Sequence, residues 1–278
     1  MKGEIGRGDR LLALDEMSRD PTSAFIEARD ISRTYVAIDG SANTAVLPTS
    51  FSIRAGEFIC ILGPSGCGKS TLLLMLAGLL APSGGEIVVE GKQLCGPHKK
   101  FGMVFQDAVL FPWRTVQRNV ELPQEVLGIP RKRRVTKASE MIKMVNLSGF
   151  SSKFPHELSG GMQQRVSIAR ALSLEPTLLL MDEPFGALDA MTREQMNLEL
   201  QRISLETKAT VIFVTHSIVE AAFLADRVFV MSERPSTVSH IVDIEIPRPR
   251  PLALMSSDQL GKYVGQLRAL LGSMESAL

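Results

Sequence analysis

The chain has 278 residues, of which 45% are hydrophobic and 22% charged, and its formal net charge is only +1. This length and composition predict one large folded core, or one core with a smaller attached subdomain, and exclude a disordered chain. The near balance of 31 basic and 30 acidic side chains indicates no nucleic-acid partner.

The first part of the chain is predicted to be rich in short β-strands. Residues 1–22 are expected to form an N-terminal tail, and the continuous apolar run EFICIL over 57–62 is typical of a strand buried on both faces. A glycine-rich loop over 63–71 follows and opens a predicted helix over about 72–80. The expected strands of this part lie at 24–31, 51–53, 57–62, 85–91 and 99–106.

The composition changes between residues 108 and 158. Charged, helix-compatible segments such as 137–145 are interrupted there by prolines, which predicts a mostly helical insertion. We expect the basic cluster Arg131 to Arg134, after Pro130, to be a solvated loop rather than a nucleic-acid patch. The later expected elements are a helix over 162–174, a strand over 177–181, a helix over 189–208, a strand over 210–215 and an amphipathic helix through Leu260, Val264, Leu267 and Leu271.

Strands that alternate with helices predict an α/β fold with a mainly parallel, open sheet. The predicted units are the tail over 1–22, a core built from 23–107 and 159–246, a helical subdomain over 108–158 and a C-terminal helical segment over 247–278. No stretch reaches the roughly 18 to 20 apolar residues that a membrane-spanning helix needs.

The stretch GPSGCGKST, residues 63–71, matches the phosphate-loop pattern G-x-x-x-x-G-K-[ST]. Glycines let backbone N–H groups point at phosphate oxygens, and a helix start adds positive potential. Lys69 is expected to reach the β- and γ-phosphates, and the Ser70 hydroxyl to ligate Mg²⁺. A glycine turn with an incidental lysine would not explain the strand before and the helix after. The predicted nucleotide-binding residues are Gly63, Pro64, Ser65, Gly66, Cys67, Gly68, Lys69, Ser70 and Thr71.

The three cysteines are odd in number and have no metal-like spacing, which favours a reducing cytoplasm over a disulfide framework. Because Cys67 lies inside the phosphate loop, we expect its thiol to react with maleimides and ATP to protect it. The alternative is a small filler residue with a buried, inert thiol.

Two carboxylates follow the apolar strand in LLLMDEP, residues 178–184. Open α/β sheets bind ligands at the carboxyl ends of their strands, so Asp182 is expected to join a magnesium shell and Glu183 to orient the attacking water. A surface pair at a strand end is the alternative, and the phosphate loop argues against it. His216 follows the buried strand over 210–215 and should emerge at the same sheet edge.

A second phosphate-binding element is predicted at LSGGMQQR, residues 158–165, where Ser159, Gly160 and Gly161 stand at a helix start. With this stretch the chain resembles the ATP-binding subunits of ABC transporters over residues 24–246. LSGGMQQR is similar to that family's signature, with Met162 where glutamine is usual. Ser217 likewise stands where importer relatives often have aspartate.

The resemblance implies a P-loop ATPase core with an antiparallel β part, ATP and Mg²⁺ as ligands, and a head-to-tail dimer. In such a dimer each signature caps the γ-phosphate held by the other chain, so one chain carries half of two sites. By the same resemblance Gln106 links the metal to the membrane partner, and Asp189 ends the loop 187–189 that crosses the dimer. His216 is then the γ-phosphate sensor. Tyr35 is a candidate for stacking on adenine, with packing in the core or at its edge as the alternative.

The resemblance is strongest to the nitrate, sulfonate, taurine and bicarbonate import group, through GPSGCGKSTLL, VFQDAVLFPWRTVQRNV and IPRPR at 246–250. It implies an importer ATPase on the cytoplasmic face of the plasma membrane, bound to a separate permease and indirectly served by a periplasmic or extracellular solute-binding protein. A soluble cassette ATPase of repair, translation or cluster assembly is the alternative. A module that binds ATP without cleaving it is disfavoured by Glu183 and His216.

Overall fold

The computed structural model describes residues 24–275, and its centre is a six-stranded sheet. Five of its strands run parallel and the edge strand β10 is antiparallel to its neighbour. β3 and β8 lie in the middle with every residue buried, which explains their continuous apolar sequences. In spatial order the strands are β10 (Val238–Asp243), β9 (Arg227–Met231), β3 (Phe58–Leu62), β8 (Thr210–Thr215), β7 (Leu178–Asp182) and β6 (Phe101–Val104).

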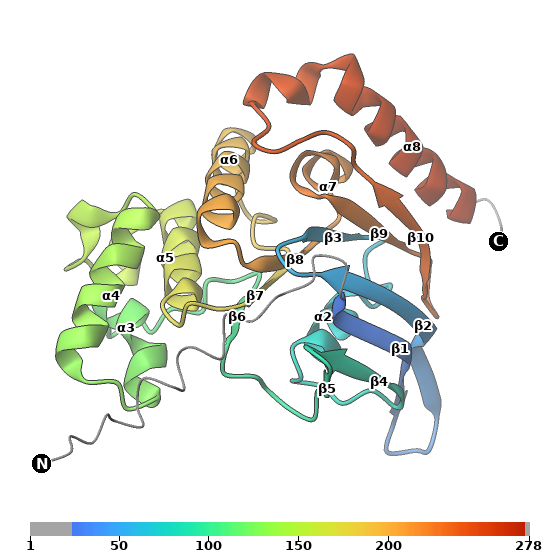
Figure 1. Ribbon diagram of the computed structural model, residues 1–278, viewed down its shortest axis with the longest axis horizontal. Helices are drawn as coiled ribbons and strands as arrows, with labels where there is room; N and C mark the ends of the chain where they lie inside the picture. Colours follow the sequence, from blue (N-terminus) through green and yellow to red (C-terminus); the bar gives the residue numbers. More distant parts are fainter. Residues whose placement is uncertain (1–23, 276–278) are drawn as a thin grey trace, which may run out of the picture.

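A second, antiparallel sheet has the order β2-β1-β4-β5 and lies beside the first in Figure 1. Helix α2 (Lys69–Leu76) packs between the two sheets in an apolar core and is hydrophobic on nearly all sides. The strands of this sheet are β1 (Ala24–Val36), β2 (Ala42–Arg54), β4 (Gly84–Val89) and β5 (Lys92–Gln93). The fold is therefore the predicted α/β architecture with an antiparallel β part.

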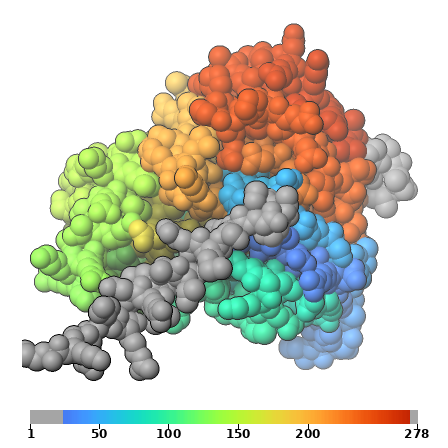
Figure 2. All heavy atoms as spheres, viewed as in Figure 1, coloured from blue at the N-terminus to red at the C-terminus, as the bar shows by residue number. Residues whose placement is uncertain are grey.

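The remaining helices form a second apolar core on the other face of the main sheet. The helices of residues 116–157 form a separate helical lobe, which is drawn in green in Figures 1 and 2. Among residues 24–275 no helix has the length and apolar character needed to cross a membrane. The helical elements are α3 (Val116–Val126), α4 (Arg131–Met144), η1 (Ser148–Phe150), η2 (Pro155–Glu157), α5 (Gly160–Leu172), α6 (Ala190–Thr207), α7 (Ile218–Leu224), η3 (Leu252–Ser256) and α8 (Asp258–Glu275).

The structure corrects the sequence prediction at two places. The strands expected at 24–31 and 51–53 are the ends of one long hairpin, β1 and β2, whose register shifts interrupt the period-two pattern. The basic cluster 131–134, expected in a loop, is the first turn of α4. Arg134 there pairs with the buried Glu121 at 3.3 Å, which anchors the helix start.

The expected C-terminal amphipathic helix is confirmed as α8, which packs on α7. Leu260 and Leu267 are fully buried, while Val264 and Leu271 are partly buried against the same core. The predicted tail, residues 1–22, lies outside the described residues.

Candidate functional site

The phosphate loop connects β3 to α2 in the way its glycines predict. Gly66 has φ +76° and Gly68 has φ +119°, conformations that a side chain would strain. A Cβ on Gly68 would also come within 3.1 Å of the Ala45 carbonyl oxygen. No side chain caps the start of α2, so its first N–H groups remain available to an anion. The hollow beside them, about 240 Å³, is lined by Ser65, Gly66, Gly68, Lys69, Ser70, Thr71 and Glu183.

Lys69 lies at the floor of this hollow and is only 5% exposed. Its ammonium donates to the carbonyl oxygens of Gly63 and Pro64 at 3.0 and 2.8 Å. It also lies 3.6 Å from a Glu183 carboxylate oxygen. The loop thus holds its lysine by its own backbone, which fixes a positive charge under the space where phosphates would lie.

Ser70 and Asp182 meet where the loop faces the end of β7. The Ser70 hydroxyl donates to Asp182 Oδ1 at 3.0 Å. Burial raises the pKa of the Asp182 carboxyl, and the hydrogen bond from Ser70 opposes this. Within residues 24–275 no group of three or more His, Cys, Asp or Glu side chains could hold a metal ion by itself. One hydroxyl and one carboxylate instead fit Mg²⁺, which takes few protein ligands together with phosphate oxygens and water.

Glu183 and His216 come together at the ends of the neighbouring strands β7 and β8. Glu183 has φ +41°, an unusual conformation for a residue with a side chain and typical of functional positions. Its carboxylate Oε2 lies 2.9 Å from His216 Nδ1. The Glu183 side chain is 21% exposed and that of His216 54%, and Glu183 also lines the phosphate hollow.

Gln106 lies in the loop after β6, the strand that pairs with β7. Gln106 Nε2 and Glu183 Oε2 lie 3.7 and 3.9 Å from where a Cβ on Gly186 would stand, so the two side chains share one corner. Helix α5 holds this loop on both sides. Gln164 donates to the carbonyl of Phe105, and Arg170 to the carbonyls of residues 108 and 109. Sequence reasoning missed both anchors because a helical Gln or Arg gives no local signal of such a contact.

The signature residues and Asp189 form a second group, apart from the phosphate hollow. Ser159 caps α5 by accepting from the Met162 N–H, and Asp189 caps α6 by accepting from the Thr192 N–H at 3.0 Å. The two helix starts touch, since a Cβ on Gly161 would lie 2.8 Å from Thr192 Cγ2. None of these residues lines the hollow around Lys69. The structure therefore brings the predicted residues together in two separate clusters.

Tyr35 is 38% exposed, which excludes the alternative that it packs inside the core. Its hydroxyl lies 3.3 Å from the Thr71 hydroxyl at the start of α2. The guanidinium of Arg33 lies 4.8 Å from the centre of its ring. The ring therefore stands beside the phosphate loop on β1.

Cys67 corrects one expectation. Its side chain is 1% exposed and packs in the core between the sheets. Burial raises the pKa of the thiol, which further reduces its reactivity. This burial argues against the expected ready alkylation and favours the filler alternative. Cys67 therefore belongs to the phosphate loop by sequence while its sulfur lies in the core.

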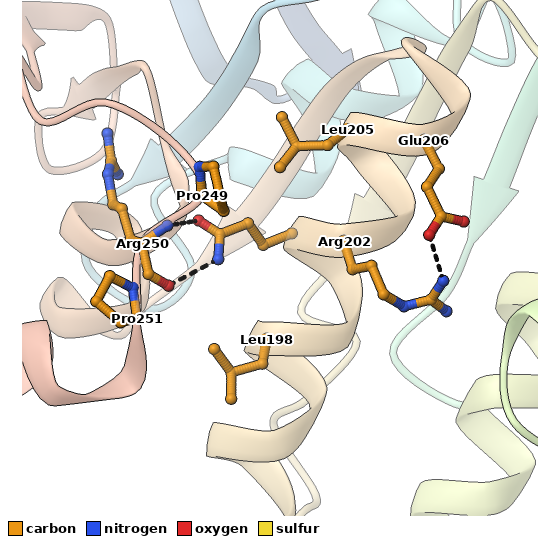
Figure 3. Close-up of a pocket in the computed structure, with 8 residues that line it drawn as sticks. Leu198, Arg202, Leu205, Glu206, Pro249, Arg250 and Pro251 are labelled. Atoms are coloured by element: carbon orange, nitrogen blue, oxygen red, sulfur yellow. Dashed lines mark hydrogen bonds and ion pairs between the residues drawn. The ribbon is translucent and has the colours of Figure 1, made fainter.

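Arg250, in the stretch IPRPR, is a buried cation whose role the sequence did not suggest. It is 1% exposed, and its guanidinium donates to the carbonyls of Ala222, Phe223, Ala225 and Ile246. Burial lowers its pKa to about 10, which leaves it charged at neutral pH. Two of the dashed lines in Figure 3 mark hydrogen bonds between the Arg250 backbone and the Gln201 side chain of α6: the Arg250 N–H donates to the amide oxygen, and the Arg250 carbonyl accepts from the amide nitrogen. Together these contacts fasten the segment 246–251 to α6 and to the C-terminal end of α7.

Comparisons with known proteins give one consistent result. Residues 46–186 match the family model described as ABC transporter. The chain is 42% identical to a nitrate import ATP-binding protein of Synechocystis, over 90% of this chain and 96% of that protein. It is 43% identical to an aliphatic sulfonates import ATP-binding protein of Bacillus cereus, over 78% and 85%. A dimeric ATP-binding cassette in a post-hydrolysis state, bound to ADP and Pi, matches 80% of this chain and 100% of its own at TM-score 0.69 and 32% identity.

Proposed function

The chain belongs to the ABC transporter family and is an ATPase, and from that premise we propose that it energises import of a small anionic solute through a separate permease. The observation that carries this proposal is the likeness to nitrate- and sulfonate-import ATP-binding proteins at 42% and 43% identity over most of each chain. Nitrate and sulfonates are small oxyanions, and with taurine and bicarbonate they form the solute class that we propose.

In this proposal the phosphate loop and Lys69 hold the β- and γ-phosphates, because N–H groups and an ammonium converge on one hollow. Glu183 orients and polarises the attacking water. His216 contacts the γ-phosphate and keeps Glu183 in place through their 2.9 Å contact. Tyr35 stacks on the adenine ring, since it stands exposed beside Thr71 where the base would leave the phosphates.

Ser70 and Asp182 would hold Mg²⁺, with Gln106 as a further contact at the same corner. Hydroxyl, carboxylate and amide oxygens are the hard ligands that this ion prefers. When bound, the ion neutralises negative charge on the phosphates. The Ser70–Asp182 hydrogen bond keeps the two side chains in register for it.

The separation of the two clusters supports a dimer in which each chain completes the other's site. Ser159 and Gly160 are exposed at the start of α5, away from the hollow around Lys69. A second copy, placed head to tail, would bring them to the γ-phosphate, with Asp189 in the loop between the copies. Two composite sites would then form from two chains.

We assign the permease to an apolar groove beside Gln106, between β6 and α3. The groove has a volume of about 480 Å³. Phe105, Val109 and Val126 line it and are 40%, 59% and 76% exposed, and exposed apolar side chains gathered in one patch are typical of protein interfaces. Because Gln106 follows Phe105 directly, a partner bound in this groove would be linked to the position of Gln106, which lies near Glu183. In this proposal the ATPase lies peripherally on the cytoplasmic face of the membrane, and a solute-binding protein acts on the far side.

The test is uptake by the reconstituted transporter. The chain and the permease encoded beside it are expected to copurify, and proteoliposomes containing both should take up one of the four proposed solutes only with ATP on the side of this chain. A Val126→Glu variant should lose copurification while keeping its nucleotide affinity. Copurification with a soluble scaffold or nucleic acid instead of a permease would favour the alternative, a soluble cassette ATPase.

A further inference from the structure

Two charged side chains behind the site, Arg193 of α6 and Glu220 of α7, have no role in the account so far. Glu220 is 6% exposed, and burial raises the pKa of its carboxyl. One of its oxygens accepts a 2.5 Å hydrogen bond from the Thr215 hydroxyl. The other faces Arg193 Nε at 3.6 Å. A buried carboxylate with one cation nearby is therefore fixed from two sides.

Glu220 holds both chain neighbours of His216. The Thr215 hydroxyl, which donates to Glu220, also accepts from the Ser217 N–H at 3.0 Å. Ser217 caps α7 by accepting from the Glu220 N–H at 3.3 Å. The Glu220 carboxylate thus holds the Thr215 side chain, and Ser217 is bonded to the Thr215 hydroxyl and to the Glu220 backbone N–H. His216, between these two residues, lies 2.9 Å from Glu183.

Arg193 connects this cluster to the loop 187–189. Its guanidinium Nη2 donates to the Leu188 carbonyl at 2.9 Å, and its backbone N–H donates to the Asp189 carbonyl at 2.9 Å. Its Nε is buried and makes no hydrogen bond within the described residues. A small cavity of about 10 Å³ is lined by Arg193, Glu220, Thr215, His216 and other residues of the site. This volume is at the lower limit for one water molecule.

We propose that Arg193 and Glu220 are positioning residues that set the place of His216 according to the position of the loop 187–189. A shift of that loop would pull Leu188 and hence the Arg193 guanidinium. Glu220 would follow, and with it Thr215 and Ser217. The proposal rests on the proposed roles of His216 and of the loop at the dimer interface. The proposal thus links closure of the dimer to the alignment of His216 with Glu183.

The alternative is that the pair only stabilises the fold, because a buried carboxylate without its cation is costly. The chain offers a matched control in Arg134 and Glu121, which lie in the helical lobe. Their ion pair measures 3.3 Å, and the Glu121 side chain is 2% exposed against 8% for Glu220. Arg118 also lies 3.7 Å from Glu121, so loss of Arg134 should cost some stability, to a smaller extent, without touching the loop 187–189.

The first experiment compares Arg193→Met with Arg134→Met for kcat, KM, melting temperature and affinity for fluorescent ADP. Arg193→Met is expected to lower kcat roughly 10- to 100-fold, as misplacement of a catalytic group by about 1 Å does, with ADP affinity unchanged. Arg134→Met should melt earlier and keep kcat within about twofold of the parent. Arg193→Lys keeps the charge beside Glu220 but loses the bond to Leu188, so it should recover the melting temperature and only part of kcat. Equal kcat values in the two Met variants would overturn the proposal.

The second experiment repeats Arg193→Met in a His216→Ala background, with release of radiolabelled phosphate to measure slow turnover. If Arg193 acts through His216, its loss should change kcat by less than about twofold there. An equal fall in both backgrounds would refute the coupling and leave the role of His216 intact. Normal turnover by His216→Ala alone would instead refute that role, and the inference with it.

Discussion

The two-cluster arrangement predicts that a charge placed on the signature spoils the partner's site and spares its own. Gly160 is the suitable position, because a Cβ there has its nearest neighbour, Leu188 Cδ2, at 4.0 Å. Gly161 is unsuitable, since its Cβ would meet Thr192 Cγ2 at 2.8 Å. We therefore compare Gly160→Asp with Gly160→Asn, two side chains of nearly the same shape that differ in charge.

The magnitude follows from electrostatics. Aspartate in the first turn of α5 is favourable to the helix by about 0.3–1 kcal/mol, so the folded monomer should lose no stability. In the composite site its carboxylate would face a γ-phosphate. Two like charges about 4 Å apart at an effective dielectric constant of about 20 repel by about 4 kcal/mol, or roughly 10³-fold in dimer closure. Gly160→Asn lacks this repulsion and retains only the effect of bulk.

The assays separate closure from binding. ATP-driven dimerisation, measured by sedimentation, and ATPase activity should fall far more for Gly160→Asp than for Gly160→Asn. Fluorescent ADP should bind both variants as it binds the parent, whereas Lys69→Ala should bind it weakly. Mixing Gly160→Asp with Lys69→Ala puts both lesions in one composite site and should restore some hydrolysis. Loss of ADP affinity in Gly160→Asp as large as in Lys69→Ala would refute the reasoning, because the signature would then serve its own chain's nucleotide.

Three further predictions concern the catalytic corner, the thiols and the C-terminal segment. Glu183→Gln should keep its affinity for ATP and lose turnover roughly 10²- to 10³-fold, measured as phosphate release, and normal turnover would remove Glu183 from its proposed role. Maleimide should label Cys95, which is exposed, and should label the buried Cys67 only after denaturation, as peptide mass spectrometry would show. Arg250→Met should lower the melting temperature by roughly 10 °C, because orphaned carbonyls cost about 3–5 kcal/mol in total, whereas Arg268→Met at an exposed site should change it little.

The fold and the catalytic corner were predictable because their signals are local. A strand such as β3 or β8 is apolar throughout, since both of its faces are covered. A glycine-rich loop between a strand and a helix has few uses other than phosphate binding. Asp182 is the last residue of β7, and Glu183 and His216 directly follow β7 and β8. The parallel sheet then brings strand ends to one edge, so residues far apart in sequence meet without any further information.

The features that could not be predicted depend on tertiary contacts, which no local sequence pattern records. The outer half of the β1–β2 hairpin is exposed and bulged, so its alternation of polar and apolar residues is lost. Cys67 belongs to a loop by sequence, yet its sulfur points into the core. Arg250 and Glu220 would each be assigned to the surface by residue type. Their burial follows only from the backbone carbonyls and hydroxyl that tertiary folding brings to them.

The structure also gives a physical reason why one chain should carry two phosphate-binding elements so far apart. Lys69 and the N–H groups of α2 neutralise a phosphate from one side only, and Glu183 places a negative charge at the edge of the same hollow. In the proposed dimer a γ-phosphate therefore needs donors on its open side, and the exposed start of α5 in the second copy would supply them. A Cβ on Gly161 would lie 2.8 Å from Thr192 Cγ2, so the signature lies directly against the start of α6, which Asp189 caps. A second copy that brings its α5 to the phosphate would thus also bring its own loop 187–189 to the interface, where Arg193 would carry a displacement of that loop to His216.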